Sequence, residues 1–260
     1  MGYDPDPGPQ MASERDKTID KTTPAPSGPR QEPAAASPRA EIDAFIKRAR
    51  TLAPSVEPGK RGRLIFALDA TMSRQPTWDT ACKLQSEMFR EAAAIGGLDV
   101  QLVYFRGLNE CRSSRWVSDG AGLGDLMARI DCRGGHTQIG KVLSHARAEG
   151  DKGKVAALVY VGDAMEEAID DLAAKAGELG LRGMPAFVFQ EGHDPVAEQA
   201  FREIARLTRG AYCRFDLSAA HELAELLRAA AVYAAGGVKA LADLSARRSA
   251  GAQKLLAQMR

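Results

Sequence analysis

From Arg63 onward the chain alternates short apolar runs with longer amphipathic runs, and this alternation constrains the fold more than any other feature. Alternating strand-like and helix-like segments are typical of βα units on a mostly parallel sheet. We therefore predict an α/β domain with a doubly wound central sheet and helices on both faces, a three-layer sandwich. The expected strands cover residues 63–68, 99–105, 115–118, 155–161, 185–190 and 211–215. The expected helices cover residues 77–95, 122–130, 138–149, 166–179, 195–208 and 219–234.

One break in this alternation concerns the third strand. The strands expected at 99–105 and 115–118 are joined by residues 106–114, and this connection is too short for a crossover helix. Parallel neighbours need a crossover of a dozen or more residues, whereas antiparallel neighbours need only a hairpin. We therefore predict that the third strand is an antiparallel strand at the edge of the sheet.

The two ends of the chain differ in composition from its middle. Residues 1–38 hold 8 of the 13 prolines and few apolar side chains, which predicts a disordered tail. Ile42, Phe45, Ile46 and Ala49 recur at helical spacing, so residues 39–58 are expected to form a docking helix and a linker. The domain itself is expected at 59–235. Residues 236–260 are basic and rich in alanine, which predicts a helical extension that packs on the domain.

Overall composition excludes several function classes. Lysine and arginine total 35 against 34 acidic residues, so no global field favours nucleic acid or an anionic membrane. No apolar stretch approaches the ~20 residues of a spanning helix, and the start MGYDPDPGPQ lacks the features of a secretory signal. The four cysteines form no CxxC pair, which argues against a zinc site or a disulfide framework. We expect a cytoplasmic chain.

Polar side chains follow two of the expected strands at their carboxyl ends. The first strand runs into Asp69-Ala70-Thr71-Met72-Ser73, and the fourth ends in Gly162-Asp163. Parallel strands present their carboxyl ends to one edge of a sheet, where ligands bind. The loop Gly134-Gly135-His136-Thr137 is expected to add a hydroxyl there. Such hard oxygen donors suit Mg²⁺, with Mn²⁺ or Ca²⁺ as alternatives. The predicted metal ligands are Asp69, Thr71, Ser73, Thr137 and Asp163.

Helix capping is the simplest alternative for some of these residues. Ser73, Thr137 and Asp163 each precede an expected helix, and Ser, Thr and Asp are preferred N-caps. Asp163 and Glu166 even have the spacing of a capping box. Capping alone does not explain five oxygen donors that come from three segments to one edge. We therefore prefer the metal site.

The order of these residues resembles the metal-ion-dependent adhesion site (MIDAS) of von Willebrand factor type A (VWA) domains, which have a Rossmann-like fold. The motif Asp69-x-Thr71-x-Ser73, Thr137 behind a glycine pair, and Asp163 after an apolar strand carry the resemblance, which spans about residues 63–234. It implies that the hydroxyls of Thr71 and Ser73 contact the metal directly. It implies that Thr137 does so in ligand-competent states, and that the two aspartates bind directly or through water.

The resemblance also implies a function. A carboxylate from a partner protein would complete the coordination of the metal, which predicts a non-enzymatic, cation-dependent protein-binding module of bacterial type. Two features depart from the family pattern: Thr71 replaces the usual serine, and Glu166 and Glu167 make the edge more acidic. Arg74 and Lys141 are expected to offset this acidity. The sequence does not identify the partner.

A phosphotransferase is the alternative function. An apolar strand that ends in Asp69 and the later Gly162-Asp163 also resemble motifs of the haloacid dehalogenase family. In that chemistry Asp69 would be the nucleophile, and a general acid would stand two residues later. Thr71 occupies that position and is a poor acid.

Overall fold

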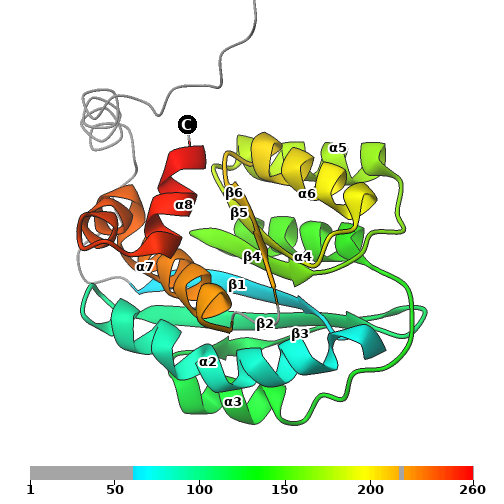
Figure 1. The fold of residues 1–260 in the computed structure, drawn as a ribbon, viewed down its shortest axis with the longest axis horizontal. Coiled ribbons are helices and arrows are strands. Elements are labelled where there is room, and N and C mark those ends of the chain that lie inside the picture. Colours follow the sequence, from blue (N-terminus) through cyan, green and yellow to red (C-terminus); the bar gives the residue numbers. More distant parts are fainter. Residues whose placement is uncertain (1–60, 217–219, 260) are drawn as a thin grey trace, which may run out of the picture. The chain divides into compact units, whose positions relative to one another are not determined.

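The computed structural model describes residues 61–216 and 220–259, which form a six-stranded sheet between two layers of helices (Figure 1). The strands are β1 (Gly62–Asp69), β2 (Leu98–Arg106), β3 (Glu110–Val117), β4 (Ala157–Gly162), β5 (Ala186–Glu191) and β6 (Ala211–Phe215). Their order is β3-β2-β1-β4-β5-β6, and all neighbours are parallel except β2 and β3. This confirms the predicted α/β fold class. The predicted tail at 1–38 and docking helix at 39–58 lie outside the described residues.

Two apolar cores lie on the two faces of the sheet. Side chains of β1 alternate between them: Leu64 and Phe66 face one core, and Ile65 and Ala67 face the other. The first core is covered by α2 (Gln75–Ala93), α3 (Gly120–Met127), α7 (Ala220–Ala246) and α8 (Ala250–Gln258). The second core is covered by α4 (Ile139–Lys152), α5 (Ile169–Leu181) and α6 (Pro195–Leu207). Because β1 is buried on both faces, its sequence is a continuous apolar run.

The hairpin between β2 and β3 is tighter than the sequence predicted. Strand β3 is antiparallel and lies at the edge, as expected, but it begins at Glu110 and not at residue 115. Only residues 107–109 form the turn, and Gly107 there has a φ of 61°. The start was missed because much of this edge strand faces solvent and carries polar residues such as Arg112 and Ser113, which hide the apolar pattern of a strand.

The last helices also extend beyond their predicted bounds. The helix expected at 219–234 continues as α7 to Ala246, with a break at Gly237, where φ is 68° and ψ is −164°. After this break, Leu241 and Leu244 return to the first core. Helix α8 follows, with the hydroxyl of Ser249 accepting a hydrogen bond from the backbone N–H of Ala252 as its N-cap. Within the part of the chain that the structure describes, no helix combines the length and apolarity needed to cross a membrane.

Close packing of β1 on α7 requires glycine at the first position of the strand. A Cβ added to Gly62 would lie 2.1 Å from the carbonyl oxygen of Ala234. The atoms that this Cβ would meet belong to the backbone of α7, so they cannot move aside as the end of a flexible side chain could. By contrast, a Cβ added to Gly177, inside α5, meets no atom within 4 Å.

We expect Gly62→Ala to lower the free energy of unfolding by about 1–3 kcal/mol, the usual cost of overpacking a core. Gly177→Ala is the matched control, and we expect it to raise stability by about 0.5–1 kcal/mol because alanine restricts the unfolded chain. Urea denaturation of both variants measures the difference. Equal stability of the two variants would contradict the packing of β1 against α7.

Candidate functional site

The predicted site residues follow β1 and β4, which are neighbours at the point where the strand order reverses. Strand β1 lies between β2 and β4: β2 pairs with one edge of β1, and β4 pairs with its other edge. The last registered pair joins Leu68 and Val161, so Asp69 and Gly162 come next, side by side. The parallel register therefore brings the loops after these two strands together.

Four of the five predicted side chains form one chain of contacts. The Asp69 Oδ1 atom accepts a hydrogen bond of 2.7 Å from the backbone N–H of Thr71. The hydroxyl oxygens of Thr71 and Ser73 lie 3.4 Å apart. The Ser73 hydroxyl in turn donates to Asp163 Oδ2 over 3.1 Å. The two loops thus contact each other through hydroxyl and carboxylate oxygens, the kind of atoms that bind hard cations.

The fifth predicted residue, Thr137, contacts the loop that carries Asp163. Its hydroxyl accepts a hydrogen bond of 3.0 Å from the backbone N–H of Glu166. Its own backbone N–H donates to the Glu166 carboxylate, also over 3.0 Å. The Nδ1 atom of His136 lies 2.8 Å from the same carboxylate oxygen. Thr137 is therefore fixed to the β4–α5 loop and not directly to the other four side chains.

Glu167 caps a helix that belongs to another segment. Helix α4 has Gln138 as its N-cap residue, with no side-chain cap of its own. The Glu167 carboxylate instead accepts hydrogen bonds of 2.7 Å from the N–H groups of Ile139 and Gly140. A carboxylate at this position also interacts favourably with the helix dipole. The carboxylates of Glu166 and Glu167, which the sequence predicts to make this edge acidic, thus accept hydrogen bonds from backbone N–H groups of the protein itself.

The two expected counter-charges occupy different places. Lys141 lies toward the β2–β3 hairpin, where its ammonium donates to the carbonyl of Asn109 over 3.2 Å and to Gln138 over 2.8 Å. Arg74 lies at the site: its Nε atom is 3.9 Å from Asp163 Oδ1, and its Nη1 atom pairs with Glu191 at the end of β5. Glu191 was not predicted as part of the site, because it is 117 residues from Arg74 and lies at the end of an ordinary apolar strand.

The capping explanation for Ser73, Thr137 and Asp163 is wrong. Helices α2, α4 and α5 have other N-cap residues, which are Arg74, Gln138 and Ala168, and none of these three helices has a side-chain cap at its N-cap. Helix α5 begins at Ile169, three residues later than predicted, because residues 163–168 form the loop that holds Thr137 and α4. Side-chain oxygens do cap α3 and α6, at Asp119 and Asp194.

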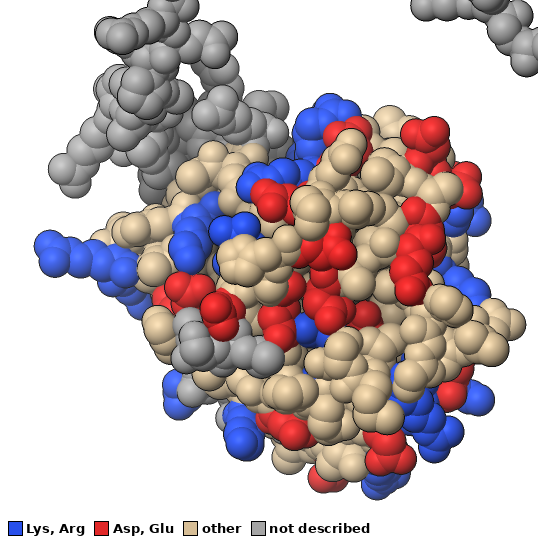
Figure 2. Space-filling model, turned by 45° about the vertical axis from the view of Figure 1, so that its right-hand side comes forward, with Lys and Arg blue, Asp and Glu red and all other residues tan. Residues whose placement is uncertain are grey.

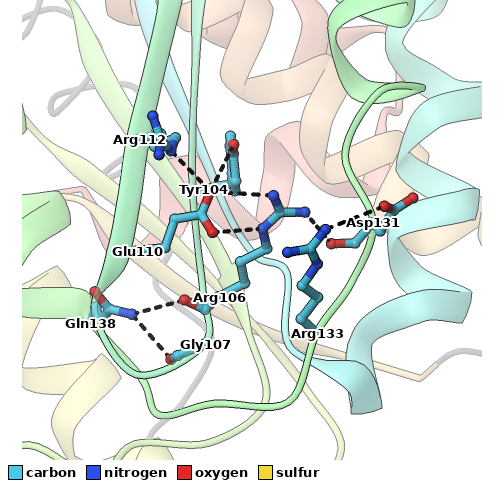
Figure 3. Close-up of polar contacts among 8 residues, drawn as sticks. All are labelled: Tyr104, Arg106, Gly107, Glu110, Arg112, Asp131, Arg133 and Gln138. Carbon is cyan, nitrogen blue, oxygen red and sulfur yellow. Dashed lines mark hydrogen bonds and ion pairs between the residues drawn. The ribbon is translucent and has the colours of Figure 1, made fainter.

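The loop that carries Thr137 is held against the β2–β3 hairpin (Figure 3). Arg106 donates to the carbonyl of Asp131 over 2.7 Å, and its Nε atom donates to Glu110 over 3.1 Å. The backbone N–H of His136 donates to the carbonyl of Gly107 over 3.1 Å. The Gln138 amide also approaches this carbonyl, over 3.4 Å. This support was not predicted, because Arg106 and Asp131 are 25 residues apart and belong to no motif.

Burial strongly affects the Asp69 carboxylate. Asp69 is 2% exposed, and its Oδ2 atom has no hydrogen-bond partner. Burial raises the pKa of Asp69 from 3.8 to about 6, against the opposing effect of its hydrogen bonds with Thr71. Asp163 raises this pKa further, and Arg74 lowers it. The protein therefore buries an acid whose second oxygen lacks a partner.

The face that carries these loops is rich in acid. Figure 2 brings forward the side toward which the β2–β3 hairpin projects in Figure 1, and acidic side chains gather near its middle. Two large apolar side chains are exposed in the loops at this edge, Met72 after β1 and Leu108 in the hairpin turn. Among the described residues, no three His, Cys, Asp or Glu side chains form a metal-binding group.

We expect the metal-free protein to be less stable above the pKa of Asp69. Because folding raises this pKa, the folded protein binds the proton of Asp69 more tightly than the unfolded chain does. The stabilisation by protonated Asp69 is therefore complete below pH 3.8, and it is lost as the pH rises through about 6. At about pH 8, with a chelator present, Asp69→Asn should be more stable than the wild type by up to about 3 kcal/mol. Urea denaturation from about pH 8 to about pH 5 measures the difference, which should shrink as pH falls. A difference that does not change with pH would contradict the buried acid.

Comparisons with known proteins agree on the fold. No family model matches the sequence, and no curated protein matches it significantly. The structure is similar to an aerotolerance-related membrane protein from Bacteroides fragilis, with 19% identity, a TM-score of 0.50, and coverage of 64% of this chain and 96% of that one. It is similar to a von Willebrand factor type A protein from Catenulispora acidiphila, with 16% identity, a TM-score of 0.55, and coverage of 68% and 43%.

A third similar structure is the SpRpn10 VWA domain, with 12% identity, a TM-score of 0.50, and coverage of 63% of this chain and 95% of that domain. At such low identity, likeness establishes the fold and leaves the site open. The order of the strands, the antiparallel edge strand and these similarities lead to one conclusion: the chain has the fold of VWA domains.

Proposed function

We propose that this chain is a non-enzymatic module that binds another protein through a divalent cation, with Mg²⁺ as the physiological ion. Asp69, Thr71, Ser73 and Asp163 would hold the cation, and Thr137 would join them from the neighbouring loop. An acidic side chain of the partner would complete the coordination. The bound cation supplies a positive charge that attracts and orients this carboxylate. We also propose that the protein is located in the cytoplasm.

The unpartnered Oδ2 atom of Asp69 carries this proposal. A buried carboxylate oxygen without a partner is costly unless something positive or a donor reaches it. The adjoining hydroxyls of Thr71 and Ser73 and the Asp163 carboxylate offer more oxygen atoms at the same place. All of these are hard donors that fit Mg²⁺, and the two hydroxyls are neutral, so they do not reduce the charge of the cation toward an incoming acid.

Charges around the site support an acidic ligand. Arg74 is buried and is paired with the partly buried Glu191, so the pair adds little net charge behind the cation. The carboxylates of Glu166 and Glu167 accept hydrogen bonds from backbone N–H groups, which disperse part of their charge. Met72 is 63% exposed and Leu108 is 78% exposed. These two side chains offer apolar contacts to the residues beside the partner's acid.

The geometry of Asp69 favours this binding role over a nucleophile. Asp69 is buried, and its Oδ1 atom already accepts a hydrogen bond from Thr71. A nucleophilic carboxylate must reach the phosphorus of a substrate and needs a general acid nearby. Thr71 stands at the position of that general acid, two residues after Asp69, but its side chain is a hydroxyl that lies beside the hydroxyl of Ser73.

We expect Mg²⁺ to stabilise the purified protein. At 100 times the dissociation constant, a ligand that binds only the folded state adds about 2.7 kcal/mol. The double variant Asp69→Ala/Asp163→Ala should lose this gain, because it removes both carboxylates. Thermal unfolding with Mg²⁺ and with a chelator measures the effect. Asp131→Ala is the matched control: its side chain is 80% exposed on the same edge, and it should keep the gain.

A wild-type protein that gains no stability from Mg²⁺, Mn²⁺ or Ca²⁺ would contradict the cation site. Hydrolysis of a generic phosphoester that is lost in Asp69→Asn would instead establish the phosphotransferase alternative.

We expect a partner to be captured by the wild type in the presence of Mg²⁺ and released by a chelator. Asp163→Ala should capture at least tenfold less of it, because the cation is held less firmly. Quantitative mass spectrometry of affinity captures from the native cell, with Asp131→Ala in parallel, measures the difference. Equal capture by the wild type and Asp163→Ala would mean that the partner binds another surface.

A further inference from the structure

Four unpartnered polar atoms belong to three side chains in or next to the candidate cation site: Asp69 is one of its residues, Arg74 Nε lies 3.9 Å from Asp163, and the Tyr160 hydroxyl lies beside Gly162. Within residues 61–216 and 220–259, five buried side-chain nitrogen or oxygen atoms have no hydrogen-bond partner. Four of the five are Asp69 Oδ2, the Tyr160 hydroxyl, and the Nε and Nη2 atoms of Arg74. Buried polar groups are nearly always hydrogen-bonded, so this concentration indicates that a small polar species belongs among them.

Packing directs the Tyr160 hydroxyl toward Asp69. The Tyr160 ring stacks on Phe105, with centroids 6.4 Å apart, and meets the edge of Phe201 at 5.4 Å. Its hydroxyl reaches the carboxyl edge of the sheet, where a Cβ on Gly162 would lie within 2.4 Å of it. Tyr160 pairs with Ala67 of β1, and Asp69 follows two residues later on the same face of the strand.

Electrostatic effects place the three side chains in one environment. Burial raises the pKa of Tyr160 well above its usual value, and the next cause is the charge of Asp69. Arg74 lowers the pKa of both Asp69 and Tyr160. Asp69 and Arg74 thus both act electrostatically on the Tyr160 hydroxyl.

The chemistry of the four atoms decides which species fits. The Tyr160 hydroxyl and the two nitrogen atoms of Arg74 are donors, whereas Asp69 Oδ2 is an acceptor. A cation accepts no hydrogen bond, so it satisfies only the carboxylate. Water accepts from the donors and donates to the carboxylate, and a buried water needs two to four such partners. A carboxylate oxygen has two lone pairs, so Asp69 Oδ2 can accept from this water and still bind the cation.

We propose that Tyr160 is a positioning residue of the cation site: together with Arg74 it holds water that donates to Asp69 and fixes this carboxylate for the cation. The inference rests on the proposed function for the part that concerns the cation. Groups that hold a ligating carboxylate from outside typically change metal affinity about 10- to 100-fold when removed. Tyr160→Phe removes only the hydroxyl and keeps the packed ring.

The experiment compares the full-length wild type with Tyr160→Phe. Calorimetric titration should show a dissociation constant for Mg²⁺ about tenfold weaker in the variant. With a chelator present, Tyr160→Phe and Asp69→Asn should shift the unfolding midpoint non-additively, because each removes one partner of the same water. Tyr233→Phe is the matched control. Its ring packs edge-on against Phe187 on the other face of the sheet, so Mg²⁺ affinity should not change.

A merely structural role for Tyr160 would alter stability without altering Mg²⁺ affinity, and its effect would add to that of Asp69→Asn. Additive shifts would overturn the inference even if the wild type binds Mg²⁺. If the wild type binds no Mg²⁺ but the two shifts remain non-additive, the proposed function and the role of Tyr160 toward the cation are both overturned. In that case the hydrogen-bonded link between Tyr160 and Asp69 stands.

Discussion

Parallel pairing of β1 with β4 is the constraint on which the site depends. The register joins Leu68 to Val161, so the chain leaves both strands at the same level, with Asp69 and Asp163 within two residues of that pair. A shift by one residue would turn Asp69 to the other face and Leu68 out of its core. The apolar side chains of β1, buried on both faces, prevent such a shift.

The loops at this edge are held by polar contacts between segments that are distant in sequence. Glu166 and Glu167 bind the backbone before and within the first turn of α4, and Arg106 binds the backbone at Asp131. Each contact satisfies backbone groups that a loop or helix end leaves unpaired. Together they fix Thr137 near the β4–α5 loop.

Sequence patterns predicted the fold and its antiparallel edge strand, since the apolar alternation and the short connection after β2 are local signals. They gave the wrong start of β3, whose exposed polar residues carry no such signal. The hydroxyls of Thr71 and Ser73, which the motif Asp69-x-Thr71-x-Ser73 singled out, lie 3.4 Å apart, and their role as metal ligands stays a prediction. Arg74 with Glu191 and the hydroxyl of Tyr160 could not be found, because their importance depends on distant neighbours.

The sequence by itself determined the class of the fold and the edge at which polar groups gather. Periodicity and strand order decide both, because apolar runs must be buried and parallel strands end on one side. Only the tertiary structure decided which charges are already used within the protein and which atoms still lack a partner. Hydrogen bonding and burial of a side chain depend on segments that meet only after folding. Glu167 accepts a hydrogen bond from the first turn of α4, and Asp69 is buried although it is the last residue of β1.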